Sequence, residues 1–123
     1  IQMNIQELAT IKENKLPIKI IILNNSYLGM VRQWQQLFYD RRYAYTDISV
    51  APNFEKLGEA YGIPGYTISE NKDLEKVLKE VLSSKEAAIV DIKIAKEENV
   101  FPMVPANSPL EKMITDEKGV LLT

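Results

Sequence analysis

The feature that most restricts the fold of this chain is an apolar run at residues 18–23. Its sequence is Ile18-Lys19-Ile20-Ile21-Ile22-Leu23, in which most residues are β-branched and one is polar. A run of this length and composition predicts a strand buried on both faces, as in a parallel sheet covered by helices. The rest of the chain must then supply helices for both faces of the sheet.

Hydrophobic periodicity predicts the remaining elements. We expect helices at about residues 4–13, 29–38, 52–61 and 71–82, strands at 66–68 and 87–94, and a short helix near 110–114. Helices alternate with strands, and this order predicts an α/β fold: a parallel sheet with helices on both faces and right-handed crossovers.

The regular pattern stops after Lys96. Three prolines, Pro102, Pro105 and Pro109, indicate an extended tail beyond this point. We therefore divide the chain into a domain at residues 1–96 and a tail at residues 97–123. The first residues, Ile1-Gln2-Met3-Asn4, do not resemble a natural start, so we expect a fragment that is truncated on its N-terminal side.

Composition excludes several classes of function for this chain. It has no Cys and no His, which excludes disulfides, thiol catalysis, a Ser-His-Asp triad and His-based metal sites. Fifteen basic and seventeen acidic residues leave a net charge of −2, so we expect no nucleic-acid partner. No apolar run is long enough to span a membrane, and we expect no membrane partner.

The polar turn at Asn24-Asn25-Ser26 follows the predicted strand and precedes the helix that begins at Gly29. Ligands of open α/β sheets bind at the carboxyl ends of strands, and helix N-termini bind phosphates. Because Asn side-chain oxygens are suitable Mg²⁺ ligands, one interpretation is a Mg²⁺-diphosphate site. The other is that the asparagines only form a turn and a helix cap.

Four segments resemble the catalytic subunits of acetolactate synthases (acetohydroxyacid synthases). Thiamine-diphosphate enzymes share a motif that begins with Gly-Asp-Gly and ends in Asn-Asn, and Asn24-Asn25 matches its end. Ile1–Leu8 resembles the segment after Gly-Asp-Gly, and Gly29–Gln35 is similar to a stretch typical of acetolactate synthases. Phe101–Pro105 resembles the C-terminal motif of the same family.

This resemblance implies part of a thiamine-diphosphate-binding domain, a Rossmann-like three-layer fold. The intact enzyme would decarboxylate pyruvate on thiamine diphosphate and condense the hydroxyethyl unit with pyruvate or 2-oxobutyrate, in branched-chain amino acid biosynthesis. We expect Mg²⁺ as a second cofactor, and FAD in many members of the family. Because the Gly-Asp-Gly segment and the activating glutamate are missing, we expect no catalytic residue in this chain and no activity from it alone.

The resemblance also implies roles for individual residues. The Asn25 side chain and the Tyr27 carbonyl would bind Mg²⁺, and N–H groups of Leu28, Gly29 and Met30 would meet the diphosphate. Met30, Val31 and Trp34 would line the substrate channel. For Met30 and Trp34, which lie four residues apart on one helix face, the alternative is core packing. The tail would cover the mouth of the active site, with Ala106 close to it.

Other polar residues have alternative interpretations. Gln33 is expected at the surface or at an interface. Arg41-Arg42 could bind a substrate carboxylate, but a solvated loop is the favoured interpretation.

The expected partners are 2-oxoacid substrates, a homodimer or tetramer of the large subunit and a small regulatory subunit. We expect a cytoplasmic protein from a bacterial source. The alternatives are another thiamine-diphosphate-dependent carboligase or decarboxylase, and a non-catalytic α/β binding domain.

Overall fold

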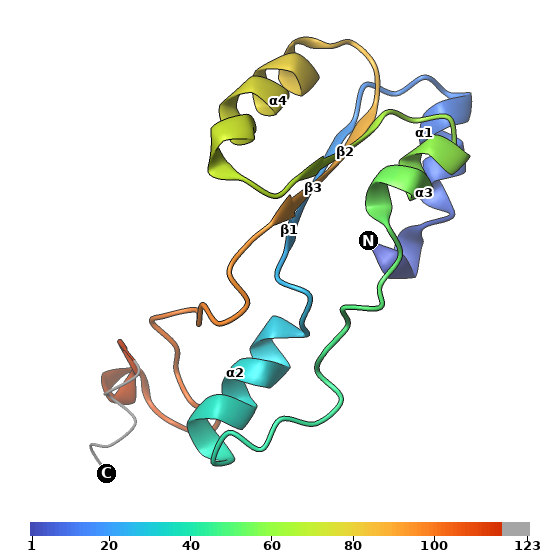
Figure 1. Ribbon diagram of the computed structural model, residues 1–123. Coiled ribbons are helices and arrows are strands. Elements are labelled where there is room, and N and C mark those ends of the chain that lie inside the picture. Colours follow the sequence, from blue (N-terminus) through green and yellow to red (C-terminus); the bar gives the residue numbers. More distant parts are fainter. Residues whose placement is uncertain (117–123) are drawn as a thin grey trace. The chain divides into compact units, whose positions relative to one another are not determined.

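The structure, a computed structural model, describes residues 1–116 (Figure 1). Its elements are η1 (Gln2–Asn4), α1 (Glu7–Glu13), β1 (Lys19–Asn24), α2 (Gly29–Phe38), α3 (Phe54–Ala60), β2 (Gly65–Ile68), α4 (Asn71–Ser83), β3 (Ala88–Lys93) and η2 (Leu110–Lys112). Every predicted element is present, most with ends shifted by a few residues. The predicted bounds of α2 are confirmed without a shift.

The chain divides into two compact units. Unit 1 consists of Ile1–Asn25 and Val50–Ile94, and unit 2 consists of Ser26–Ser49 and the chain from Ala95 onward. Unit 1 contains the sheet with α1, α3 and α4. Unit 2 contains α2, the loop that follows it and the tail. The predicted division into residues 1–96 and 97–123 remains a prediction.

The sheet of unit 1 has the strand order β1-β3-β2, and both strand pairs are parallel. Successive residues of β3 point to opposite faces, so Ile89 and Val90 belong to separate clusters. The Ile89 cluster contains residues of α1 and α3, and the Val90 cluster contains Val81 of α4. Helices thus cover both faces of the sheet, which confirms the predicted α/β class (Figure 1).

The prediction that residues 18–23 are buried on both faces is wrong. In the described part of the chain β1 pairs only with β3, and Ile21 and Leu23 are 43% and 66% exposed. Both side chains lie on the α4 face of the sheet, because they pair in register with Val90 and Ile92. Since α4 packs on β2 and β3, this face of β1 has no cover within residues 1–116.

Local sequence signals explain both ends of α3. The side chain of Asn53 caps the first turn, because its oxygen accepts a 2.9 Å hydrogen bond from the N–H of Lys56. At the other end Gly62 has a φ of +67°. The N–H groups of Gly62 and Ile63 donate to carbonyls in the last turn, at 2.8 Å each. This is a Schellman end, which requires the left-handed conformation that glycine adopts at least cost.

We predict that Gly65→Ala destabilises the sheet of unit 1. A Cβ at Gly65 would lie 2.3 Å from the carbonyl oxygen of Glu55 and 2.6 Å from its Cα, so α3 would have to move away from β2. Overpacking of this kind costs about 1–3 kcal/mol in unfolding free energy. Thermal unfolding would measure the loss, with Thr67→Ala on the exposed side of β2 as the control. Equal melting temperatures for the two variants would contradict the prediction.

Candidate functional site

The turn after β1 has an unusual backbone. β1 ends at Asn24, and Asn25 is the last residue of this segment of unit 1. Ser26, the next residue, has a φ of +61°, in the left-handed region that non-glycine residues seldom adopt. Sparsely populated backbone conformations cluster at functional sites, so this turn is a candidate site on conformational grounds as well.

Tyr27 of unit 2 forms an isolated antiparallel bridge with Asp47. The bridge has two hydrogen bonds of 2.9 Å. The N–H of Leu28 donates to the Thr46 carbonyl, and the N–H of Ile48 donates to the Ser26 carbonyl. In such a pair the carbonyls of the bridged residues point away from the partner strand, so the Tyr27 carbonyl is directed away from Asp47. Hydrogen bonds from the Ser49 side chain and backbone hold the pKa of the Asp47 carboxyl below its usual value.

The N-terminus of α2 has no cap from a side chain. Leu28 is the N-cap residue, no side-chain hydrogen bond is made there, and the first turn contains no acidic residue. The first N–H groups of a helix have no partner within the helix, and the helix dipole favours an anion beside them. The start of α2 therefore has the chemistry of a phosphate-binding helix end.

Apolar and polar side chains of α2 occupy the reverse of their usual places. Its buried residues are Arg32 and Gln33, which are 5% and 1% exposed. Met30, Val31 and Trp34 are 53%, 50% and 38% exposed. Exposed apolar residues that gather on one surface mark sites for ligands or partners. The outer face of α2 is therefore a candidate binding surface.

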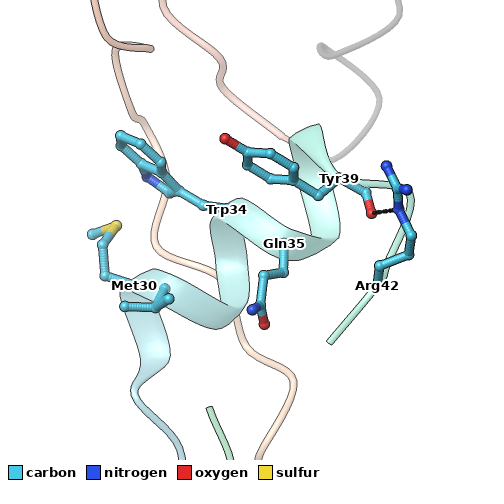
Figure 2. Close-up of a pocket in the computed structure, with 6 residues that line it drawn as sticks. Met30, Trp34, Gln35, Tyr39 and Arg42 are labelled. Atoms are coloured by element: carbon cyan, nitrogen blue, oxygen red, sulfur yellow. Dashed lines mark hydrogen bonds between the residues drawn. The ribbon is translucent and has the colours of Figure 1, made fainter. Parts of the chain in front are cut away.

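A pocket of about 670 Å³ lies on this outer face (Figure 2). Its lining residues are Met30, Val31, Trp34, Gln35, Tyr39 and Arg42. Figure 2 shows the side chains of Met30 and Trp34 on the same side of α2, with Arg42 beyond the end of the helix. Arg42 donates a 3.2 Å hydrogen bond to the Tyr39 carbonyl and lies 3.5 Å from Asp40. The pocket thus has apolar walls and one cation.

The pocket brings together the three predicted channel residues with others that sequence analysis did not select. Gln35 donates to the Ala44 carbonyl at 2.9 Å and accepts from the Thr46 hydroxyl at 3.1 Å, which fixes the loop after α2. Sequence periodicity could have suggested Gln35, which lies four residues after Val31 on the helix surface. Arg42 lines the pocket and Arg41 does not, a difference that periodicity cannot predict for a loop.

Gln33 is inside unit 2, so the prediction that it lies at the surface or at an interface is wrong. Its side-chain amide donates to the Val100 carbonyl at 2.9 Å, and its side-chain oxygen accepts from the Val100 N–H at 2.8 Å. A long polar side chain is usually exposed. Pairing with the backbone of a residue far away in the sequence is what removes Gln33 from solvent.

Comparison with protein families identifies the domain. The family profile described as "Thiamine pyrophosphate enzyme, C-terminal TPP binding domain" matches residues 1–92. The chain belongs to this family. The matched range includes the turn at Asn24-Asn25 and all of α2, so the cofactor-binding family and the candidate helix end coincide in the sequence.

Curated relatives of this thiamine-pyrophosphate-binding domain are acetolactate synthase large subunits. The chain is 45% identical to that of Porphyra purpurea over 114 residues, which is 92% of the chain and 19% of the relative. It is 42% identical to the isozyme 2 large subunit of Escherichia coli over 91% of the chain and 20% of the relative. The chain is 44% identical to the Haemophilus influenzae large subunit, over 93% of the chain and 20% of the relative. The chain thus spans about a fifth of these relatives' length.

A solved structure has the same fold. It is the thiamine diphosphate-dependent 4-hydroxybenzoylformate decarboxylase of Rhodococcus jostii RHA1, with a TM-score of 0.71 and 23% sequence identity. The alignment covers 80% of this chain and 18% of the decarboxylase. Within residues 1–116, no helix has the length and apolar character needed to cross a membrane.

We predict that Trp34→Ala lowers the stability of this thiamine-pyrophosphate-binding domain much less than truncation of a core aromatic residue does. Trp34 is 38% exposed and lines an open pocket, so its truncation should cost about 1 kcal/mol. The matched control is Phe54→Ala, because Phe54 is 4% exposed and should cost about 3–5 kcal/mol. Calorimetric unfolding of both variants compares the two costs. Equal losses would show that Trp34 belongs to the core.

Proposed function

We propose that this chain binds the diphosphate of thiamine diphosphate within the catalytic subunit of an acetolactate synthase. The observation that carries the proposal is the start of α2, a helix end without a side-chain cap that follows Asn24-Asn25 inside the matched family range. The likeness to acetolactate synthase large subunits, over more than nine tenths of the chain, favours this enzyme among thiamine-diphosphate enzymes.

We propose that Asn25 and Tyr27 bind Mg²⁺. Mg²⁺ prefers oxygen ligands and often shares the oxygens of a bound phosphate. No group of three or more His, Cys, Asp or Glu residues that could hold a metal occurs within residues 1–116. An Asn amide oxygen and a backbone carbonyl are neutral oxygen ligands, which suit a site where the diphosphate supplies the negative charge. The direction of the Tyr27 carbonyl, away from Asp47, supports its role as a ligand.

The Leu28 N–H, which the resemblance also assigns to the diphosphate, already donates to the Thr46 carbonyl at 2.9 Å. We propose that the N–H groups of Gly29 and Met30 orient the diphosphate. They lie at or beside the first turn of α2, where a bound anion meets both the hydrogen-bond donors and the positive end of the helix dipole. Thiamine diphosphate, when bound, supplies the electron sink for decarboxylation and carbon–carbon bond formation. This chain contributes position and electrostatics.

The pocket on the outer face of α2 is the proposed channel for 2-oxoacid substrates. Pyruvate and 2-oxobutyrate each combine a short apolar end with a carboxylate. Met30, Val31 and Trp34 provide apolar walls, and Arg42 provides the one guanidinium of the pocket lining. We propose that Arg42 attracts the substrate carboxylate, because a cation in a pocket mouth raises the local concentration of anions.

The properties of the whole enzyme are also proposals. A subunit of this kind would assemble as a homodimer or tetramer, with a small regulatory subunit as a further partner. Residues 97–123 would cover the mouth of the active site, with Ala106 close to it; residues 117–123 of this segment lie outside the described residues. FAD would bind chiefly outside this chain. The expected inactivity of the isolated chain, the cytoplasmic location and the bacterial source remain predictions.

We predict that Asn25→Ala in the intact enzyme strongly raises the requirement for Mg²⁺ and thiamine diphosphate. Losing one contact to a charged group costs roughly 1.5–3 kcal/mol, which is about ten- to a hundredfold in affinity. Titration of the apoenzyme with Mg²⁺ and thiamine diphosphate would measure the change, with melting temperature recorded alongside.

Asn24→Ala is the matched control for this titration. Asn24 is the last residue of β1, and we expect its loss to act through the turn more than through the metal. If the Asn25→Ala enzyme binds both cofactors as tightly as the parent, then Asn25 is a turn residue and the proposed metal site is wrong.

The nearest alternative is another carboligase or decarboxylase that uses the same cofactor. The products of the intact enzyme distinguish the two. Acetolactate from pyruvate supports the proposal, whereas a free aldehyde or a different ligation product would replace it with the alternative.

A further inference from the structure

Gln33 connects two segments of unit 2 that lie far apart in the sequence. Its carboxamide makes a reciprocal pair with the backbone of Val100, with distances of 2.9 Å to the carbonyl and 2.8 Å from the N–H. The same side-chain nitrogen lies 3.1 Å from the sulfur of Met103. The pair uses one donor and one acceptor on each partner, as a backbone does in a sheet. A single buried side chain therefore fixes the tail to α2.

Arg32, the preceding residue, binds the same part of the tail. Its guanidinium lies 3.1 Å from the carboxylate of Glu97 and 4.6 Å and 5.2 Å from the ring centres of Tyr43 and Tyr27. Because Glu97 is exposed, solvent weakens this ion pair. Gln33 is itself buried, and its pair with Val100 has two hydrogen bonds, so it is the second attachment between α2 and residues 97–103.

The tail attachment and the pocket use opposite sides of α2. Each residue of an α-helix turns by about 100°, so the adjacent residues Arg32 and Gln33 share one side. Met30 and Trp34 lie on the other side, where they line the pocket. The tail and a ligand in the pocket thus contact the same short helix without sharing a side chain.

We infer that Gln33 is a positioning residue for the α2 pocket. By fixing residues 97–103 to the inner side of α2, it couples the order of this tail segment to ligand binding on the outer side. The inference rests on the proposed function, because it takes the pocket as the substrate channel. The inner side of α2 buries Arg32 and Gln33 and no fully buried apolar residue, so loss of the tail would remove the Gln33 contacts and leave the stacking of Arg32 on Tyr27 and Tyr43. Coupling between two binding events is reciprocal, so a ligand in the pocket would also strengthen the tail attachment.

A carboxamide is the group that suits this position. It donates to the Val100 carbonyl and accepts from the Val100 N–H at the same time. A leucine of similar length can do neither. A carboxylate can accept but cannot donate, and it would face the carbonyl with a like partial charge. A protonated carboxyl group regains the donor, which makes Gln33→Glu a variant whose attachment depends on pH.

The test uses the intact enzyme loaded with Mg²⁺ and thiamine diphosphate, with pyruvate as the probe of the pocket. In Gln33→Leu we expect amide exchange at residues 97–103 to become roughly ten- to a hundredfold faster, since two hydrogen bonds to a buried group are lost. Exchange within α2 should rise with it. The KM for pyruvate should increase up to about tenfold, with a smaller change in kcat.

Gln33→Glu tests the role apart from any general loss of structure. Relative to the parent at each pH, its KM should be raised near pH ~8 and should return toward the parent value near pH ~5.5, because burial raises the pKa of an introduced carboxyl above about 4.3. Gln6→Glu on the exposed surface of unit 1 is the matched control, and it should change neither exchange nor KM.

Three results would overturn the inference. The first is a Gln33→Leu enzyme in which the tail exchanges faster while α2 exchange and KM stay at the parent values. The second is unchanged exchange at residues 97–103. The third is a ratio between the KM of Gln33→Glu and the KM of the parent that stays constant across pH. This result is decisive even where Gln33→Leu does not fold. Failure of the proposed function would be seen separately, as an Asn25→Ala enzyme with unchanged cofactor binding.

Discussion

The structure of unit 1 depends on the double burial of β3. This strand pairs with β1 on one edge and β2 on the other, and its Ile89 and Val90 are 0% exposed on opposite faces. Each helix that covers the sheet contributes a buried side chain to the cluster of one of these two residues. Asp91, also buried in β3, has one carboxylate oxygen with a 2.7 Å contact to Lys93 and one without a hydrogen-bond partner among residues 1–116. Apolar burial on β3 must outweigh that cost.

Polar contacts organise unit 2, where Ile114 is the one buried apolar side chain among the residues up to 116. Three of its buried side chains are Arg32, Gln33 and Thr46, and each contacts a segment outside its own element. Hydrogen bonds and ion pairs of this kind hold the segments of unit 2 in place without burying apolar side chains. The apolar residues of α2 are therefore left on its outer face, where they form the pocket. The attachment of α2 through its polar side thus explains both the burial of its polar side chains and the exposure of its apolar ones.

Much of the candidate site could be predicted from the sequence, and the remainder depended on residues distant in the chain. The bounds of α2 follow from helical spacing, whereas the grouping of Met30, Val31 and Trp34 at one pocket follows from the family motif. Gln33 was misplaced because its partner, Val100, lies 67 residues away, and no local pattern encodes that bond. Arg42 was assigned to a solvated loop, and it is exposed as expected. Its place in the pocket lining could not be predicted, since a loop has no fixed period that assigns its side chains to one face.

The sequence by itself determined the order of helices and strands, the Asn53 cap, the glycine end of α3 and the family of the domain. Each depends on residue types at short spacing, where local sterics and hydrogen bonding act directly. Only the tertiary structure decided which strand is central. Residues 19–24 and 88–93 are both apolar enough for a buried strand, yet in the sheet that residues 1–116 form, β3 lies between its neighbours and β1 pairs with β3 alone. Composition sets how much a strand gains by burial, but its place in the sheet decides whether cover is available on both faces.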